Sequence, residues 1–357
     1  MTLFAHLPGA VVDDAGVVLH FGDPIREQRL LQRGALVPLP REVIRLAGPD
    51  RMTWLDSITS QRLDLAAGES TENLVLSPNG KVEHAMRLVD DGEALWAIVD
   101  AGRAESLVAF LTRMRFMNDV EIDLQPDVAV VGVSAGAAAP EGVVWVDPWP
   151  NVSPGGVRYG DYEGDDPWRW REVIVLADSK PPEASVAGAS AYEAARVAAG
   201  RPSIADVDDR AIPHELDWLA TAGHLDKGCY RGQETVAKVH NLGAPPRRLT
   251  LLHLDGSDSV MPLPGAEVLH DGKPAGAVTS AAYHYELGPI ALALLKRGLD
   301  PQATLTVLAG DSGAHEITAA QEVLVPPTAG RANRPPRMPR LGAVKRPTRD
   351  APPPAAD

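Results

Sequence analysis

A single cysteine lies in a segment whose residues suit thiol chemistry. Residues 225–235 read LDKGCYRGQET, so that two glycines closely flank Cys229. Glycine lets the backbone turn sharply and approach a ligand. A short helix is predicted from residue 233 onward, and the dipole at its start would favour thiolate over thiol, as would the cations Lys227 and Arg231. Cys229 is therefore the candidate reactive centre; the alternative is a small apolar side chain buried in the core.

Histidines near this segment raise the question of a metal site. His214, His224 and His240, together with Cys229, could ligate a soft metal or the edge of a cluster. No C-x2-C pair pre-shapes such a site, and Trp218 stands where an H-E-x-x-H motif starting at His214 needs its second histidine. We therefore expect these histidines in loops and helix caps, and we predict no bound metal.

Composition narrows the classes of function. The formal net charge of −14 repels nucleic acid and anionic membranes over most of the surface. Neither a G-x-G-x-x-G after a strand nor a G-x-x-x-x-G-K-[ST] is present, which leaves phosphate binding by such loops without support. One cysteine excludes an intrachain disulfide, and we find no signal peptide and no apolar run of about 18 residues. We expect a cytoplasmic monomer without direct contact to nucleic acid or membrane.

The segment around the cysteine resembles the K-G-C-[YF]-x-G-Q-E signature of the YgfZ family, folate-binding proteins related to the glycine-cleavage T-protein and to an iron–sulfur assembly factor. The matching residues are Lys227, Gly228, Cys229, Tyr230, Arg231, Gly232, Gln233 and Glu234. Further segments resemble family elements in the same order: 48–59 (G-x-D…L…T), 77–81 (P-x-G-K), 195–202 (R-x-x-x-G-x-P) and 212–215 (I-P-H-E). The resemblance covers residues 40–325.

The resemblance implies a fold of the α+β class and a cofactor. Antiparallel sheet-and-helix domains would surround a central, folate-sized opening with the thiol at its rim, and a β-barrel would follow. The ligand would be tetrahydrofolate or a folate derivative. Tyr192 stands where the family places a folate-contacting aromatic residue, whose ring could stack on the pterin or the aminobenzoate. Arg115 and Arg196 are candidates for binding the glutamate carboxylates; the alternative for each is a surface ion pair.

Two positions argue against the chemistry of the T-protein. Aminomethyl transfer to tetrahydrofolate uses an aspartate on the strand after the glycine turn and a glutamate on the helix before G-x-P. This chain has His84 and Ala198 where we align those carboxylates. An alanine cannot share a proton with a folate nitrogen, so that aminomethyl transfer is not expected. His84 could act as a base, or it could be a strand residue bonded locally.

The resemblance thus implies a folate-binding protein that supports assembly or repair of iron–sulfur clusters in client enzymes, with Cys229 as the functional thiol. The alternative is a tetrahydrofolate-dependent aminomethyl or one-carbon transferase. A third possibility is a scaffold that binds client proteins through its acidic surface and needs neither folate nor a reactive thiol.

Length and turn signals predict the elements that must position these residues. With 357 residues, two or three domains are expected. We assign residues 1–245 to the folate-binding region, with two subdomains that divide near 125–150. Short apolar runs between Gly, Pro and Asp turns place a β-barrel at 246–325. Residues 326–357 contain nine prolines and seven Lys/Arg against two Asp, a net +5, and are predicted to be a disordered tail.

Local patterns predict several elements within the first region. A helix capped by Asp50 would place Met52, Leu55, Ile58 and Leu63 on one face. An antiparallel meander follows from 74 to 99, with turns at 77–80 and 90–92. Further helices are expected from residue 104 and over 191–199, and the Gly/Pro/Trp-rich stretch 148–170 is expected to be a surface excursion.

Overall fold

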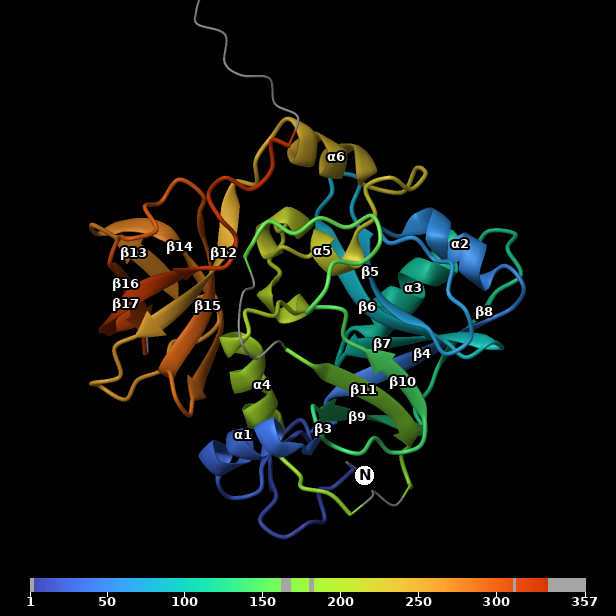
Figure 1. Ribbon diagram of the computed structural model, residues 1–357, viewed down its shortest axis with the longest axis horizontal. Helices are drawn as coiled ribbons and strands as arrows, with labels where there is room; N and C mark the ends of the chain where they lie inside the picture. Colours follow the sequence, from blue (N-terminus) through green and yellow to red (C-terminus); the bar gives the residue numbers. More distant parts are fainter. Residues whose placement is uncertain (1–2, 162–167, 180–182, 311–312, 333–357) are drawn as a thin grey trace, which may run out of the picture.

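The computed structural model describes residues 3–161, 168–179, 183–310 and 313–332. Within these residues the strands form a five-stranded sheet, a four-stranded sheet, a small N-terminal pair and a closed six-stranded barrel. Figure 1 shows the barrel on one side, the two larger sheets on the other, and helix α4 between them. The antiparallel sheets and the barrel confirm the predicted α+β class.

The first sheet has the strand order β5-β6-β7-β4-β8. Its strands and covering helices are β4 Arg41–Ala47, α2 Arg51–Ile58, β5 Ser70–Leu76, β6 Val82–Asp90, β7 Ala94–Asp100, α3 Ala104–Met114 and β8 Glu121–Leu124. Apolar residues of both helices pack on one face of the sheet. Helix α2 ends before the predicted Leu63, which is buried in the following loop. Asp50 stands at the predicted N-cap position, but its carboxylate accepts a hydrogen bond from Asp119 N (2.8 Å) and from no N–H of the helix.

The second sheet has the order β10-β11-β9-β3 and draws on separated parts of the chain. Its strands and adjacent elements are β1 Val11–Val12, β2 Val18–His20, α1 Pro24–Arg33, β3 Leu36–Leu39, β9 Val128–Ser134, β10 Val143–Val146, β11 Trp170–Leu176 and α4 Ala189–Ala198. Strand β3 precedes the first sheet in sequence and pairs with β9 of the second. The two sheets are therefore interleaved along the chain rather than divided at one point.

Helix α1 illustrates how local sequence sets an element beside the later site. The Asp23 side chain accepts a hydrogen bond from Arg26 N (2.9 Å), and Pro24 occupies the first turn, where its missing N–H costs nothing. The helix ends at Gly34, whose φ of +103° is open to glycine and strained for other residues.

The barrel closes in the order β12-β15-β14-β13-β16-β17. Its strands are β12 Arg247–Leu254, β13 Glu267–His270, β14 Lys273–His284, β15 Gly288–Lys296, β16 Leu305–Ala309 and β17 His315–Val323. Closure removes the unpaired edges, and inward residues of every strand form one apolar core. The predicted β-barrel is confirmed.

Short helical elements connect the sheets to the barrel: η1 Ile204–Asp206, η2 Pro213–Leu216, α5 Leu219–Ala222 and α6 Gln233–Asn241. Of the stretch 148–170, predicted to be a surface excursion, residues 148–161 pack against these elements, and residues 162–167 lie outside the described residues. Ser153 N donates to Ala220 O (2.8 Å), Leu225 N to Gly155 O (2.8 Å), and Trp149 is 2% exposed. Its tryptophans supply enough apolar surface to bury a Gly/Pro-rich segment.

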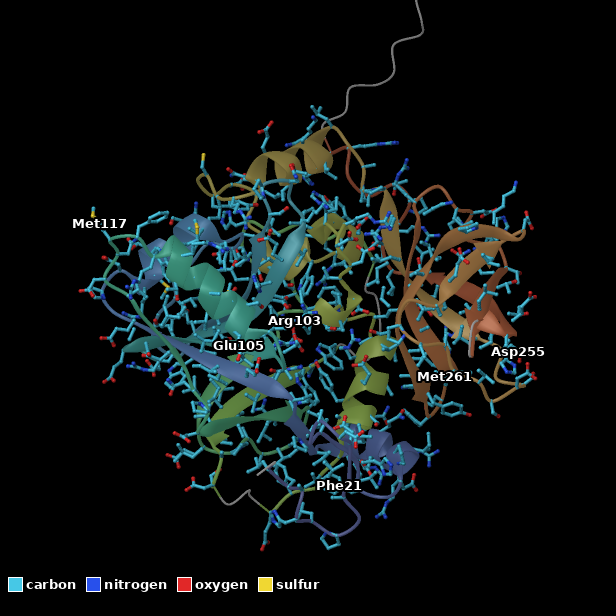
Figure 2. The ribbon with its side chains drawn as sticks, turned by 180° about the vertical axis from the view of Figure 1, so that it is seen from behind. Phe21, Arg103, Glu105, Met117, Asp255 and Met261 are labelled. Carbon is cyan, nitrogen blue, oxygen red and sulfur yellow. The ribbon has the colours of Figure 1, made fainter. Side chains whose placement is uncertain are left out.

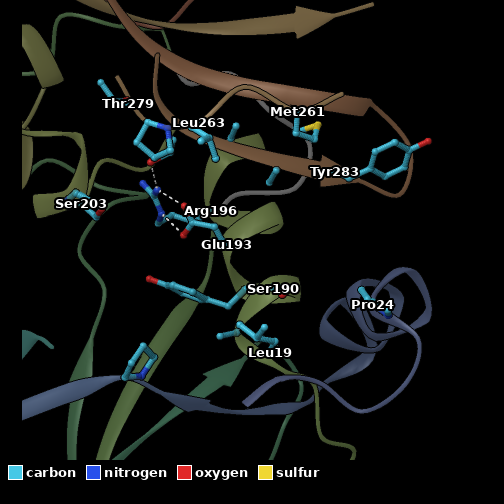
Figure 3. A pocket seen from close by; sticks show the side chains of 18 of the residues that line it. Leu19, Pro24, Ser190, Glu193, Arg196, Ser203, Met261, Leu263, Thr279 and Tyr283 are labelled. Atoms are coloured by element: carbon cyan, nitrogen blue, oxygen red, sulfur yellow. Dashed lines mark hydrogen bonds and ion pairs between the residues drawn. The ribbon is translucent and has the colours of Figure 1, made fainter. Parts of the chain in front are cut away.

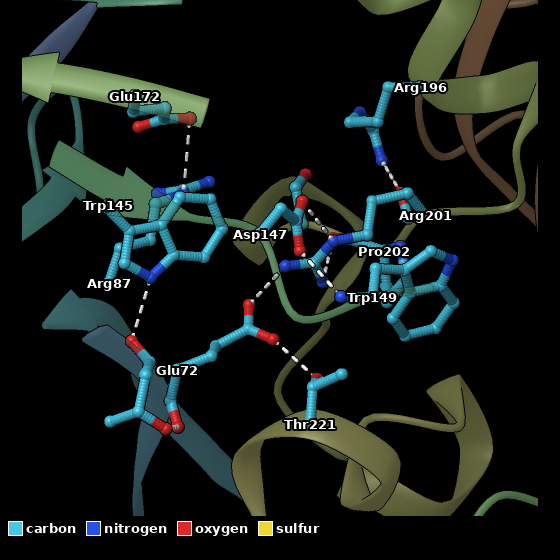
Figure 4. A network of polar contacts seen from close by, with 12 residues as sticks. Glu72, Arg87, Trp145, Asp147, Trp149, Glu172, Arg196, Arg201, Pro202 and Thr221 are labelled. Carbon is cyan, nitrogen blue, oxygen red and sulfur yellow. Dashed lines mark hydrogen bonds and ion pairs between the residues drawn. The ribbon is translucent and has the colours of Figure 1, made fainter. Parts of the chain in front are cut away.

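A buried arginine joins three of these regions (Figure 4). Arg201, just after α4, donates to Glu72 of β5 (2.6 Å) and to Asp147 after β10 (3.1 Å), and Glu72 also accepts from the Thr221 hydroxyl of α5 (2.6 Å). The guanidinium stacks on Trp149 with 4.9 Å from carbon to ring centroid. This network fixes α4 and α5 relative to both sheets.

The predicted tail begins later than residue 325. Ala329 is 3% exposed in the core beneath α6, Ala332 N donates to His240 O (2.9 Å), and Arg297 donates to Pro327 O (3.3 Å). Gly330 approaches α6 so closely that a Cβ would lie 2.9 Å from Val239 O. Small residues between the prolines permit this packing, which composition alone does not reveal. Residues 333–357 of the predicted tail lie outside the described residues.

Candidate functional site

The thiol loop, residues 224–231, presents Cys229 to solvent between α5 and α6. Cys229 is exposed and reduced, so the alternative of a small buried side chain is wrong. Helix α6 begins at Gln233 after the N-cap Gly232, as the sequence predicts. The neighbouring residues of the motif differ sharply in burial: Gly228 and Glu234 are exposed, whereas Lys227 and Tyr230 are buried.

Lys227 anchors the thiol loop to the end of helix α2. Its Nζ donates to the carbonyl oxygens of Asp56 (2.6 Å), Thr59 (3.0 Å) and Gln61 (2.9 Å), and to the Asp56 carboxylate (3.0 Å). A cation is favourable at a helix C-terminus, where carbonyl groups lack helical partners. Burial lowers the pKa of Lys227. The ammonium group therefore has a structural role that the sequence did not indicate.

Two glycines let the loop meet the turn after β5. Gly232 has φ +87°, and a Cβ there would lie 2.5 Å from Ser77 O; Gly80, with φ +73°, would bring its own Cβ to 2.9 Å from Thr235 Cβ. Both positions combine a left-handed backbone with a close approach, which requires glycine. By contrast, a Cβ on Gly228 would meet nothing within 4 Å.

The remaining motif residues close the loop. Arg231 pairs with Glu83 of β6 and lies over the Phe110 ring, 5.5 Å from carbon to centroid. Gln233 Nε2 donates to Lys227 O (2.9 Å) across the base of the loop. Tyr230 is buried, and burial raises its pKa to about 12. The motif thus holds one exposed thiol in a fixed backbone.

The histidines near the motif have separate environments. His214 is fully buried; its Nε2 contacts Val236 O (3.0 Å), and burial lowers its pKa to about 4. His240 bonds the Tyr159 hydroxyl (2.9 Å), and the ring of His224 packs on Gly155. Among the described residues, no three His, Cys, Asp or Glu side chains converge as a metal site would require.

A cavity of about 940 Å³ lies between α1, α4 and the barrel (Figure 3). Leu19, Pro24 and Ser190 form one side, and Met261, Leu263 and Tyr283 form the barrel side. Cys229 is not among the residues that line this central cavity, and the expected thiol at the rim of a folate pocket stays a prediction. The motif loop lies between α5 and α6, and Lys227 anchors it to the end of α2.

A charged cluster forms the floor of the central cavity. Arg41 of β4 pairs with Asp100 of β7 and with Glu172 of β11 (3.0 Å), and Arg87 of β6 reaches the same two carboxylates at 3.4 Å. Despite burial, the two arginines hold the pKa of Asp100 well below its usual range. Asp100 is the partly exposed member, with 20% of its side chain accessible, and it lines the cavity with Arg41.

Tyr192 is one of the residues that line the central cavity. Its ring lies 4.8 Å from Trp170, centroid to centroid, and Arg41 lies over it at 5.6 Å. Its hydroxyl accepts a hydrogen bond from Arg41 (3.1 Å), and burial raises its pKa. The ring faces are thus already used within the protein, which leaves little surface for the predicted stacking on a pterin.

The predicted carboxylate-binding arginines need correction. Arg196 lines the cavity, but its five N–H donors point to Glu193, Asp206, Ser280 and Arg201 O, and no donor remains for a ligand. Arg115 is exposed in the loop after α3 and does not line the cavity. Figure 2 shows the neighbouring Met117 at the outer edge of the first sheet, far from Met261 of the cavity. Contacts between residues far apart in sequence occupy the donors of Arg196, and the fold places Arg115 away from the cavity.

His84 and Ala198 do not line the central cavity. His84 lies with Val99 and Arg103 in a crevice that has no room for a water molecule, and burial lowers its pKa. Ala198 lines a smaller cavity of about 260 Å³, beside Trp168. Sequence reasoning missed Arg41, which begins strand β4, and Asp100, which ends strand β7. In sequence, a charged residue at the end of an apolar strand looks the same whether it is buried or exposed to solvent.

Comparison with known proteins shows which fold this architecture represents. Residues 247–325 match the family model of the glycine cleavage T-protein C-terminal barrel domain. The whole fold is similar to the crystal structure of glycine cleavage system aminomethyltransferase T from Bartonella henselae, with a TM-score of 0.68 over 92% of this chain and 97% of that one, at 16% identity. The chain therefore has the T-protein fold, with a T-protein barrel domain at its C-terminal end.

Curated relatives extend the comparison beyond the barrel. The tRNA-modifying protein YgfZ of Aliivibrio fischeri is 24% identical over 277 residues, 72% of this chain and 83% of that protein. A putative chloroplastic transferase of Arabidopsis thaliana is 33% identical over 127 residues, 32% of this chain and 26% of the relative, so this chain matches only about a quarter of that protein's length. These findings confirm the resemblance to the YgfZ proteins and to the T-protein. Among the described residues, no helix has the length and apolar character needed to cross a membrane.

Proposed function

We propose that this protein binds tetrahydrofolate or a related folate in the central cavity and supports assembly or repair of iron–sulfur clusters in client enzymes through the thiol of Cys229. The observation that best supports this proposal is the structure of the thiol loop. Lys227, Gly232 and Gln233 fix a backbone that presents one exposed cysteine. An exposed thiol held by buried neighbours suits reaction with a partner molecule better than packing.

Folate binding is supported by the T-protein barrel domain and by the shape of the cavity. Its volume of about 940 Å³ lies within the ~300–1,000 Å³ range of small-molecule sites. Apolar walls and a few polar groups on the floor are the usual composition of such sites. The partners expected are folate and iron–sulfur client enzymes.

The test is Cys229→Ser in a strain that lacks the protein. Serine keeps the volume but loses the nucleophile and soft ligand, so the variant should bind tetrahydrofolate with wild-type affinity and fail to restore iron–sulfur enzyme activity. Alkylation is a useful control, because Cys229 is the sole cysteine and the variant should resist iodoacetamide completely. Full restoration by Cys229→Ser would show that the function does not need the thiol. Absence of tetrahydrofolate binding to the wild type would refute the proposed folate binding.

The second candidate is a one-carbon transferase, which the fold shared with the Bartonella aminomethyltransferase and the name of the Arabidopsis relative favour. His84 and Ala198 oppose it, since the loss of a general acid or base typically costs ~10²- to 10⁴-fold in rate. We therefore expect no aminomethyl transfer from the lipoyl carrier protein to tetrahydrofolate in a purified assay. Robust transfer would make this candidate the better one.

A further inference from the structure

The turn that joins α3 to β8, residues 115–118, exposes two large apolar side chains. Phe116 is 78% exposed and Met117 is 99% exposed, the highest fractions of any large apolar side chain in the described part of the chain. Figure 2 shows Met117 at the outer edge of the first sheet. A single exposed apolar residue is ordinary, whereas apolar side chains that gather on the surface mark sites of interaction.

The backbone of this α3–β8 turn is fixed in an unfavourable conformation. Phe116 has φ +49°, in the left-handed region that aromatic residues seldom adopt. The Asn118 side chain donates to Arg115 O (2.7 Å), and Asp119 N donates to the Asp50 carboxylate (2.8 Å). Strained residues persist where the surrounding structure holds them, and they gather at functional sites. The turn therefore presents a preformed pair of side chains, which lowers the cost of ordering them on binding.

The α3–β8 turn and the thiol loop are attached to the same helices. Arg231 of the thiol loop and Arg113 of α3 both lie over the ring of Phe110, at 5.5 and 5.9 Å from carbon to centroid. Helix α2 holds both segments: Trp54 Nε1 donates to the last carbonyl oxygen of α3 (2.9 Å), and Lys227 donates to the carbonyl oxygen that follows α2 (3.0 Å). Figure 1 shows α2 between α6 and β8, the elements that follow the thiol loop and the turn. A partner seated on the turn therefore lies beside the thiol loop.

The charges around the turn indicate the chemistry of that partner. Arg113 and Arg115 are exposed, and neither forms an ion pair with another described residue; one lies over an aromatic ring and the other donates to a carbonyl oxygen. Arginine, phenylalanine and methionine are the residues enriched in protein–protein interfaces. On the other side of the turn, the exposed carboxylates of Asp119, Glu121 and Asp123 would repel nucleic acid or an anionic membrane. The surface therefore fits a protein whose apolar pocket is bordered by carboxylates.

We propose that the α3–β8 turn docks the iron–sulfur client protein: Phe116 and Met117 enter an apolar pocket of the client, and Arg113 and Arg115 face carboxylates at the rim of that pocket. Docking there would hold the client against Cys229. This inference rests on the proposed function and adds the surface that recognises the client. An exposed thiol reacts with many partners and discriminates little between them, so a second contact outside the thiol loop supplies the specificity.

The double variant Phe116→Asn, Met117→Ser of the full-length protein separates docking from folding. Asparagine tolerates the left-handed backbone, so the thermal midpoint should stay unchanged or rise, and tetrahydrofolate affinity and the alkylation rate of Cys229 by iodoacetamide should stay unchanged. In a strain that lacks the protein, restoration of iron–sulfur enzyme activity should fall about 10-fold or more at equal protein levels. The matched control is Leu176→Ser, which removes an apolar side chain that is 63% exposed at the end of β11 and should restore activity fully.

Binding to a purified client completes the test, with the iron–sulfur enzyme that the wild type restores in that strain as the probe. The double variant should bind it about 10- to 100-fold more weakly than Leu176→Ser does, the range expected when interface anchors are truncated. Equal affinity and full restoration would overturn the docking role. If the double variant does not fold, Arg115→Glu decides, and an unchanged affinity in that variant would overturn the proposal.

Other occupants of the turn give different results. Binding of the wild type to phosphatidylglycerol vesicles that the double variant loses would assign the turn to a membrane and overturn the proposal. A wild-type dimer in sedimentation that the double variant loses would assign it to a second copy of the chain, with the same consequence. If the wild type restores no iron–sulfur enzyme, the proposed function fails instead, so the two failures can be told apart.

Discussion

Replacing Lys227 by methionine measures what the motif lysine contributes to the fold. The buried ammonium group serves three carbonyl oxygens and the Asp56 carboxylate, all within 3.0 Å. Methionine keeps most of the apolar stem and leaves those acceptors unpaired. Breaking a buried charge pair costs ~3–5 kcal/mol, and a hydrogen bond to a charged group is worth ~1.5–3 kcal/mol. Because the Asp56 side chain is 33% exposed and regains water, we expect a loss of about 2–4 kcal/mol.

The assay is urea unfolding followed by tryptophan fluorescence, with Lys238→Met as the matched control. Lys238 is exposed on helix α6, so its replacement should change the free energy of unfolding by less than about 0.5 kcal/mol. The slope against urea should stay the same for both variants, which assigns the difference to the native state. Equal stabilities of the two variants would refute the structural role of Lys227. The role predicted from sequence, a cation beside the thiol, would then be the better interpretation.

Two further predictions concern pH and the C-terminal segment. Burial raises the pKa of Asp217 to about 7, so between pH 4 and 7 the native state keeps a proton that the unfolded chain has lost, and this group costs stability as pH rises, on the order of 1 kcal/mol per unit. Asp217→Asn should therefore gain stability relative to wild type from pH 5 to pH 7 in urea titrations; a pH-independent difference would contradict the raised pKa. Deleting residues 333–357 should leave the thermal midpoint unchanged, whereas deleting 326–357 should lower it by a few degrees, because the longer deletion removes Ala329 from the core beneath α6; equal midpoints would contradict the packing.

The sequence predicted the features that depend on neighbouring residues. The glycine before Gln233 and the apolar spacing after it indicated helix α6, and the alternation beyond residue 246 indicated the barrel. The setting of glycines and charges left open whether Cys229 is a reactive thiol or a small buried side chain, and the structure shows that it is exposed. In each case the pattern that defines the helix or the single strands lies within a few positions along the chain, although the pairing that closes the barrel joins distant strands.

The features that failed depend on residues far apart in sequence. Arg41 meets Asp100 and Glu172 across 59 and 131 positions, and Lys227 meets Asp56 across 171. A charged residue carries no local sign that its partner lies on another sheet. Arg196 was predicted to bind a ligand for the same reason, since its type suits a carboxylate and only the fold shows that Asp206 and Glu193 already occupy it.

The separation of thiol and cavity bears on what the folate could do. Two arginines hold the pKa of Asp100, which lines the cavity, well below its usual range, and burial lowers the pKa of His84. Both shifts move the pKa away from the region near 7, where a general acid or base works best. These groups are therefore poorly suited to moving the protons of a bound folate. Since Cys229 does not line the cavity, chemistry at the thiol and binding of folate should respond to different substitutions, which is why Cys229→Ser is expected to leave the tetrahydrofolate titration unchanged while Asp100→Asn alters it.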